Sequence, residues 1–103
     1  MDNHIRKVYV PMTETGYYIL LNLIEPTYGY DITNKVKEMT DGEIVIGPGT
    51  IYGSLGKMEK DGLIKIYDER DNRKIYLITE LGQEVLELEK KRIKRLYRTL
   101  NGE

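Results

Sequence analysis

The chain has 103 residues, of which 40% are hydrophobic and 32% charged, with a formal net charge of −1 and no cysteine. The length predicts one small domain, the composition excludes a disordered chain, and the lack of cysteine excludes disulfide frameworks, thiol nucleophiles and cysteine zinc sites. The first residues lack the features of a signal or transit peptide, and the longest apolar run, YYILL, is too short to span a membrane, so we expect a cytoplasmic protein.

The first twelve residues carry β-favouring side chains and end at Pro11, which predicts an extended N-terminal arm over residues 1–12. A first helix follows and runs to about residue 24. Thr13 is its expected N-cap, and Glu14 lies in the first turn, where a helix favours negative charge. His4, the single histidine of the chain, falls in the arm and is expected at the surface.

A second helix is predicted over residues 30–40, since Ile32, Val36 and Met39 recur at helical spacing. The run EIVI at 43–46 predicts a short strand. A third helix follows over about 48–61, because proline is favoured at the first position of a helix and Gly62 suits a left-handed C-cap.

Two β-rich runs, LIKIY and KIYLIT, predict a hairpin over about 63–78, joined by the polar segment DERDNR. Thr79 can cap a last helix, in which Leu86, Ile93 and Leu100 are spaced seven residues apart. The expected fold is mainly α with a small β-hairpin. Its parts are an arm (1–12), a winged helix-turn-helix (13–78) and a C-terminal dimerisation helix (79–103).

In the winged helix-turn-helix plan, the third helix lies in a DNA major groove and the hairpin reaches along the backbone. Placing Ile51, Leu55 and Met58 inward turns two glycines outward, which let the helix approach phosphates closely. The candidate DNA contacts from this helix and the hairpin tip are Thr50, Tyr52, Ser54, Lys57, Lys60, Arg70, Arg73 and Lys74, with Gly53 and Gly56 between them. The alternative is that the glycines are merely tolerated and the lysines solvated.

Residues 48–74 contain six basic and five acidic side chains, a net charge of +1. This weak positive charge predicts that tight binding needs two copies of the site. The last helix offers an apolar stripe for a two-fold dimer, namely Leu86, Ile93, Leu96, Tyr97 and Leu100. The alternative is that the stripe folds back on the first helix. The basic run KKRIKRLYR suits a phosphate or membrane patch, but the acidic residues Glu84, Glu87 and Glu89 just upstream favour a solvated dimer helix.

Three segments in this order and spacing resemble the PadR family of transcriptional regulators, in its short form with one C-terminal helix. They are ILLNLIEPTYGYDI, GTIYGSLGKMEKDGLI and RKIYLITELG, and the likeness covers about residues 13–100. The resemblance implies a winged-helix dimer, usually a repressor, whose C-terminal helix contacts helix one of the partner. It also implies DNA contacts by Tyr30, Thr50, Tyr52, Ser54, Lys57, Arg70, Arg73 and Lys74.

The chain departs from the family pattern at two positions of the third helix, where Gly53 and Lys57 replace a frequent proline and arginine. Lysine keeps the charge but loses the bidentate fork that reads guanine. Some members bind flat drugs on a tryptophan, but this chain has none, and Ile93 falls at about the matching place. Drug sensing by that mechanism is therefore unsupported, a small-molecule effector is possible but without support in the sequence, and no cofactor or metal is expected.

Two other functions compete with DNA binding. An enzyme is disfavoured because the chain has no placed base or nucleophile and its GPG segment lacks the continuation of a phosphate-binding loop. A winged helix that binds protein instead of DNA is favoured only by the near-neutral charge. We therefore predict a sequence-specific, homodimeric DNA-binding regulator, a repressor by the implied class, with half-sites about 34 Å apart.

Overall fold

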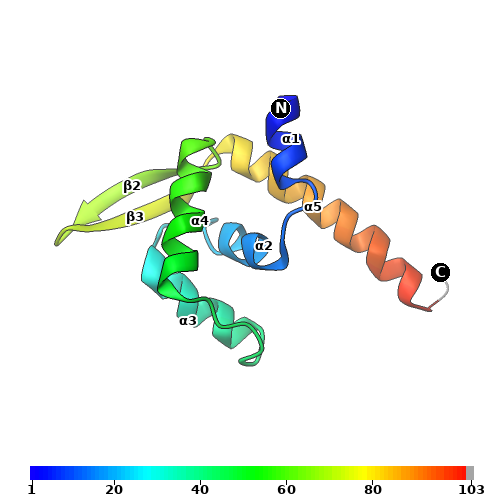
Figure 1. Ribbon diagram of the computed structural model, residues 1–103, viewed down its shortest axis with the longest axis horizontal. Coiled ribbons are helices and arrows are strands. Elements are labelled where there is room, and N and C mark those ends of the chain that lie inside the picture. The colour runs from blue at the N-terminus through cyan, green and yellow to red at the C-terminus, as the bar shows by residue number, and fades with distance from the viewer. Residues whose placement is uncertain (102–103) are drawn as a thin grey trace.

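The computed structural model describes residues 1–101 (Figure 1). Helix α4 (Pro48–Lys60) crosses the centre of the molecule. The hairpin of β2 (Ile64–Arg70) and β3 (Arg73–Ile78) extends from one side, and α5 (Glu80–Arg98) extends away from the other. Because the hairpin and α5 point in opposite directions, the molecule reaches 51 Å along its longest axis and only 21 Å along its shortest. The domain boundaries predicted above stay predictions; residues 102 and 103, in the last segment, lie outside the described residues.

The prediction of an extended N-terminal arm is wrong, because the segment forms helix α1 (Asn3–Tyr9). The Asp2 side chain caps it by accepting a hydrogen bond from the Ile5 N–H at 2.9 Å. Ile5 and Tyr9, one helical turn apart, are both buried against the core. The cap and this burial outweigh the β-propensity of the local sequence.

Helix α2 (Glu14–Leu21) begins as predicted, since the Thr13 hydroxyl accepts a hydrogen bond from the Gly16 N–H at 3.0 Å. Helix α3 (Gly29–Met39) follows after a short strand β1 (Thr27–Tyr28). The strand predicted at 43–46 is wrong, because residues 44–47 are irregular. The third strand lies instead in β1, where Thr27 and Tyr28 pair with the hairpin.

Helix α4 (Pro48–Lys60) confirms the predicted third helix, with Pro48 at its start and Gly62 past its end. Gly62 has a φ of +83°, the left-handed conformation that glycine adopts without strain. The Leu63 N–H donates to the Met58 carbonyl at 2.9 Å and closes the helix end. Ile51, Leu55 and Met58 face the core as predicted.

Strands β2 (Ile64–Arg70) and β3 (Arg73–Ile78) form the hairpin, with β1 on the other edge of β3 in an antiparallel sheet of order β1-β3-β2. The segment DERDNR is not a loop, because most of it continues the strands and only Asp71 and Asn72 form the turn. Both turn residues have positive φ, 52° and 62°, as in the two-residue turns that match strand twist. This hairpin, residues 64–78, is called the wing from here on.

Helix α5 (Glu80–Arg98) starts at the predicted cap Thr79 and ends in a 3-10 turn, Thr99–Asn101. Its first half packs on the core, whereas its second half extends beyond it (Figure 1). Leu86, predicted at a dimer interface, is only 2% exposed and belongs to the core of its own chain. The core lies between α1, α2, α3, α4, α5 and the sheet, and its fully buried side chains include Ile19, Leu20, Leu23, Ile32, Val36, Leu55, Leu63 and Val85.

Candidate nucleic-acid interface

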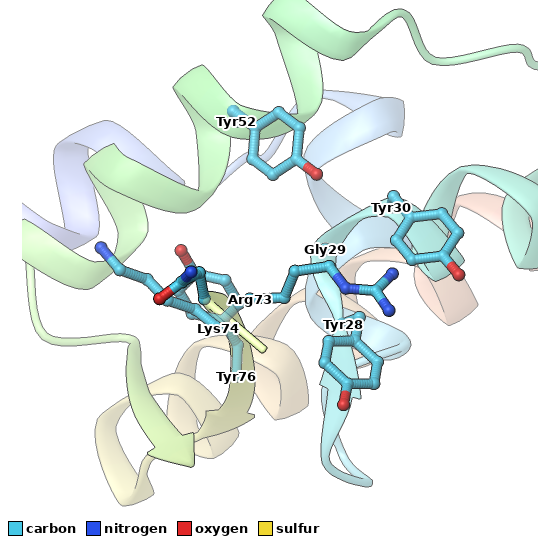
Figure 2. Close-up of a pocket in the computed structure, with 8 residues that line it drawn as sticks. Tyr28, Gly29, Tyr30, Tyr52, Arg73, Lys74 and Tyr76 are labelled. Carbon is cyan, nitrogen blue, oxygen red and sulfur yellow. The ribbon is translucent and has the colours of Figure 1, made fainter. Parts of the chain in front are cut away.

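Four of the predicted DNA contacts come together at a hollow between α3, α4 and the wing (Figure 2). The hollow has a volume of about 260 Å³ and is called the notch below. Three elements supply its lining, namely the junction of β1 with α3, the middle of α4, and the start of β3. The lining residues are Tyr28, Gly29, Tyr30, Tyr52, Asn72, Arg73, Lys74 and Tyr76.

The Arg73 side chain reaches across the notch to two tyrosines, Tyr28 at the end of β1 and Tyr30 at the start of α3 (Figure 2). Its guanidinium carbon lies 5.1 Å from the ring centroid of Tyr28 and 5.3 Å from that of Tyr30. Both distances are within the roughly 6 Å range of a cation–π interaction. The wing is thereby connected to the start of α3 through a charged side chain.

Strand register explains how Arg73 and Tyr28 meet. Tyr28 of β1 pairs with Ile75 of β3. Arg73 precedes Ile75 by two residues, so Arg73 lies on the same face of the sheet as Tyr28 and diagonal to it. A long side chain can span that diagonal. Tyr28 was not among the predicted contacts. The one signal in the sequence is the pattern Tyr-Gly-Tyr at 28–30, and the sequence alone does not show that Arg73 lies across the sheet from it, because that depends on the strand register.

Gly29 lets the start of α3 approach α4 closely. A Cβ atom at this position would lie 2.8 Å from Leu55 Cδ1 and 3.1 Å from Tyr52 Cε1. Both distances are shorter than ordinary van der Waals contact. The glycine therefore fixes the spacing between Tyr30 on α3 and Tyr52 on α4, the two sides of the notch.

The turn of the wing places Arg70 directly opposite Arg73 on the paired strand. The Arg70 Nε, however, donates to Asp68 Oδ2 at 2.9 Å. The pKa of Asp68 is lowered from its ordinary value, first by the hydrogen bond from the Glu69 N–H and then by that from Arg70. Part of the charge of Arg70 is thus neutralised within the wing, which leaves Arg73 and Lys74 as the cations that face the notch.

The outward face of α4 is open. Gly53, Gly56 and Lys60 are exposed, and a Cβ atom built on either glycine would meet nothing within 4 Å. Thr50 is also exposed near the start of the helix. The predicted outward orientation of these residues is therefore confirmed, although their contact with DNA stays a prediction.

Ser54 and Lys57 do not join the notch. They line a separate hollow of about 200 Å³ between α1, α2 and α4, together with Tyr9. The Lys57 Nζ lies 3.3 Å from Asp61 Oδ2 and 5.8 Å from the centroid of the Tyr9 ring. Lys57 thus already has partners within the chain, unlike the open Lys60.

Asp61 links the end of α4 to α1. The Tyr9 hydroxyl donates to Asp61 Oδ2 at 2.6 Å. This hydrogen bond is the main cause that lowers the pKa of Asp61, and Lys57 adds to it. The pKa of Tyr9 is raised, chiefly by burial and then by the same hydrogen bond.

The second half of α5 and the 3-10 turn after it carry the exposed part of the predicted stripe. Ile93, Leu96, Tyr97 and Leu100 are 37%, 50%, 66% and 72% exposed. Glu89, which the sequence suggested as part of a solvated acidic face, is instead fully buried. Its carboxylate accepts hydrogen bonds from the Met12 N–H and from Arg92 Nε, and so connects the α1–α2 segment to α5.

Two further features of residues 1–101 concern metals and membranes. These residues contain no group of His, Asp or Glu side chains arranged to hold a metal ion. Within the same part of the chain, every helix is too short or too polar to cross a membrane.

Known proteins share both the sequence pattern and the fold of this chain. The model of the transcriptional regulator PadR-like family matches residues 18–88. A transcriptional regulator from Clostridium thermocellum superposes with a TM-score of 0.74 at 29% identity, covering 97% of this chain and 96% of its own. The PadR of Bacillus subtilis, solved in complex with operator DNA, gives a TM-score of 0.65 at 28% identity, over 73% of this chain and 45% of its own.

Curated sequences agree with the structural matches. The transcriptional regulator YqjI of Escherichia coli is 25% identical over 80 residues, which is 76% of this chain and 39% of YqjI. The chain thus spans less than half the length of the first curated relatives it matches.

Proposed function

The chain belongs to the transcriptional regulator PadR-like family, and from that premise we propose that it binds double-stranded operator DNA through α4, the start of α3 and the wing. The observation that carries the proposal is the notch, where cations of the wing and tyrosines of two helices lie beside the open face of α4. In this arrangement α4 enters the major groove and the notch follows the adjacent backbone.

Each residue type has a role in this proposal. The exposed Gly53 and Gly56 let the backbone of α4 approach the DNA, while Lys60 and Lys74 supply charge for phosphates. Thr50 and the hydroxyls of Tyr30 and Tyr52 can donate to phosphates or base edges. Ser54 and Lys57, which line the other hollow, are expected at the edge of the contact.

We further propose that two chains bind together. The net charge of +1 over residues 48–74 is small, so one copy offers few phosphate contacts. The second half of α5 and the 3-10 turn after it expose a stripe of apolar side chains at the opposite end of the molecule from the wing, made of Ile93, Leu96, Tyr97 and Leu100. A two-fold dimer through this stripe presents two copies of α4 to two half-sites. The proposed role is a repressor in the cytoplasm.

The decisive test is binding of the purified protein to labelled duplex DNA from the region upstream of its own gene, across salt concentrations. We expect two chains per site, preference over random duplex, and a log–log slope of about −0.9 for each phosphate contact. The lack of preference over random duplex, even at low salt, would contradict the proposal and favour a winged helix that binds protein.

A pair of charge reversals locates the interface. The double variant Lys60→Glu with Lys74→Glu is expected to weaken binding to every duplex and to reduce the salt slope by about 1 for each phosphate that a lysine no longer neutralises. The matched control reverses two exposed lysines of α5, Lys91→Glu with Lys94→Glu. Equal weakening by both double variants would assign the DNA contact to the basic run of α5 instead.

The dimer has its own test. Leu96→Gln removes an apolar side chain from the stripe, whereas Lys94→Gln alters a neighbouring exposed residue of the same helix. Burial of one leucine contributes about 1.5–3 kcal/mol, and a two-fold interface contains it twice. Sedimentation is expected to show dissociation of the Leu96 variant alone; dimers of unchanged stability in both variants would place the interface elsewhere.

A further inference from the structure

The three cations at the tip of the wing are held differently. Arg70 forms an ion pair with Asp68, and Lys74 extends away from the tyrosines that flank Arg73 (Figure 2). Arg73 lies against Tyr28 and Tyr30, and among the ion pairs of residues 1–101 none includes it. Its guanidinium is therefore positioned by aromatic rings and not by a carboxylate.

This difference matters for what the guanidinium can still bind. A carboxylate partner uses the N–H groups of arginine, whereas stacking on an aromatic ring uses only the faces of the guanidinium plane. The Tyr30 side chain also hydrogen-bonds the guanidinium, and this contact is the main cause that raises the pKa of Arg73. The other N–H groups at the edge of the plane remain available as donors. They match the oxygens of a phosphate in bidentate geometry. Arg73 is thus held in place with donors available to a ligand.

We propose that Tyr28 and Tyr30 form an aromatic clamp that presents Arg73 to one phosphate of the DNA backbone, with Tyr28 as a positioning residue that does not itself touch DNA. The inference rests on the proposed function and adds to it a residue that the sequence did not suggest. The clamp consists of Tyr28, Tyr30 and Arg73.

A backbone phosphate is the ligand that the position of the clamp favours. In a helix-turn-helix protein the second helix contacts base edges while the first crosses the backbone. Arg73 lies beside the start of α3, the first of the two helices, and across the notch from Tyr52 on α4. The clamp therefore lies at the side of the open face of α4, where the sugar–phosphate chain passes.

The clamp also lowers the entropic cost of binding. A free arginine side chain at the tip of a hairpin must be ordered when it contacts DNA. The backbone of Tyr28 is held in place, because it pairs with Ile75 and Tyr28 is the N-cap residue of α3. Contact with a ring carried on this fixed backbone restricts Arg73 before DNA arrives.

The test is a double-mutant cycle on duplex binding by the full chain. Tyr28→Leu removes the aromatic face and keeps an apolar side chain, whereas Tyr28→Phe keeps the ring. We expect Tyr28→Leu to weaken binding by about two- to five-fold, the range of an exposed cation–π contact, and Tyr28→Phe to bind as the unaltered protein does. Arg73→Gln is expected to reduce the salt slope by about 0.9, the value for one phosphate.

The cycle separates positioning from a general structural role. If Tyr28 acts through Arg73, Tyr28→Leu has little further effect in the Arg73→Gln background. The clamp is overturned if the weakening persists undiminished in that background, or if Tyr28→Phe and Tyr28→Leu bind equally well. Absence of duplex binding by the unaltered protein would instead remove the proposed function, so the two failures are distinct.

Folding of the variants is checked by thermal unfolding. Should Tyr28→Leu unfold, Tyr30→Leu and Tyr30→Phe take its place, because Tyr30 is 47% exposed on the first turn of α3 and contributes little to the core. The same difference between the leucine and phenylalanine variants is expected there, because both variants lack the hydroxyl and only the phenylalanine keeps the ring. Equal binding by both Tyr30 variants would overturn its part in the clamp.

Discussion

The first turn of α5 and the outward face of α4 both carry glycine, in opposite surroundings. At Gly82 on α5, a Cβ atom would collide with the backbone carbonyl of Leu63 and lie 2.6 Å from Ile78 Cγ1. At Gly53 and Gly56 on α4, a Cβ atom would meet nothing within 4 Å. The first region has no room for a side chain, whereas the second is open to solvent.

The difference separates two reasons for a glycine in a helix. Each such glycine costs roughly 0.5–1 kcal/mol against alanine. At Gly82 the fold requires glycine despite this cost, because α5 can pack against the start of β2 only if residue 82 has no side chain. At Gly53 and Gly56 nothing within the described chain requires it. We propose that the reason for the glycines of α4 lies outside the chain, in the DNA backbone that the helix would approach closely.

The largest effect is expected at the packed region. Gly82→Ala should lower the free energy of unfolding by about 2–3 kcal/mol, because the added methyl meets a backbone carbonyl that cannot move aside. Chemical denaturation of the variant measures the decrease. Gly56→Ala serves as the control with the same chemical change in open space. Equal losses of stability at the two positions would show that the close packing around Gly82 does not determine the cost of the added methyl group.

An intermediate effect is expected at Gly29, where the start of α3 comes close to α4. Its added methyl would lie 2.8 Å from Leu55 Cδ1 and 3.1 Å from Tyr52 Cε1, which are ends of side chains and not backbone. Because side chains can shift, Gly29→Ala should destabilise by about 1–2 kcal/mol. The Tyr52 ring must move, so DNA affinity should fall as well. Denaturation and duplex binding measured together check both changes, and a variant with unaltered affinity would show that the position of Tyr52 is not critical.

The sequence predicted these regions unequally. Helical spacing placed Gly53, Gly56 and Lys60 on the outside of α4 correctly, because one helix and its buried face determine which residues turn outward. The N-cap at Thr79 and the C-cap glycine at Gly62 were equally local signals and are confirmed. Hydrophobic periodicity and capping residues were thus enough to predict these features, because each of them depends on a single helix.

Features that depend on two elements could not be predicted in this way. The meeting of Tyr28 with Arg73 depends on strand register, and the burial of Leu86 and Glu89 depends on where α5 packs. The short β1 carries only two residues, too few to show alternation, so the β-rich run 43–46 gives the stronger strand signal although it forms no strand. Helix α1 is likewise hidden, since its stability comes from burial of Ile5 and Tyr9 against distant residues.

The open face of α4 allows a prediction of opposite sign. Gly53→Ala and Gly56→Ala should each raise the free energy of unfolding by about 0.5–1 kcal/mol, because alanine is the better helix former and no neighbouring group is disturbed. Their affinity for operator DNA should nevertheless fall, since the methyl groups hold the helix away from the backbone. Stability and affinity thus change in opposite directions within one variant.

A control for that prediction is Lys94→Ala, an alanine substitution at an exposed position in the second half of α5, the helix that extends away from the wing (Figure 1). It is expected to leave operator affinity unchanged. Glycine variants of α4 that gain stability and keep full affinity would show that the glycines are merely tolerated. The open surroundings of the α4 glycines would then carry no information about DNA binding.

The smallest effect is expected at Asp61, where the open face of α4 meets the packed α1. The pKa of Asp61 is lowered from its ordinary value of 3.8, first by the Tyr9 hydroxyl and then by Lys57. A group whose pKa is lower in the folded protein adds stability above its unfolded pKa, and that stability is lost as the pH falls through the folded pKa. The unaltered protein should therefore be more stable than Asp61→Asn at neutral pH, and the difference should vanish in acid.

Tyr9→Phe is the matched variant for this last prediction, because it keeps the buried ring and removes only the hydroxyl that donates to Asp61. It should reproduce part of the destabilisation at neutral pH and show a weaker dependence on acid, since only Lys57 and the charge of His4 then lower the pKa of Asp61. Denaturation of the three proteins at several pH values measures the difference. An identical pH dependence in the unaltered protein and Tyr9→Phe would show that the hydroxyl does not connect α1 to α4 in solution.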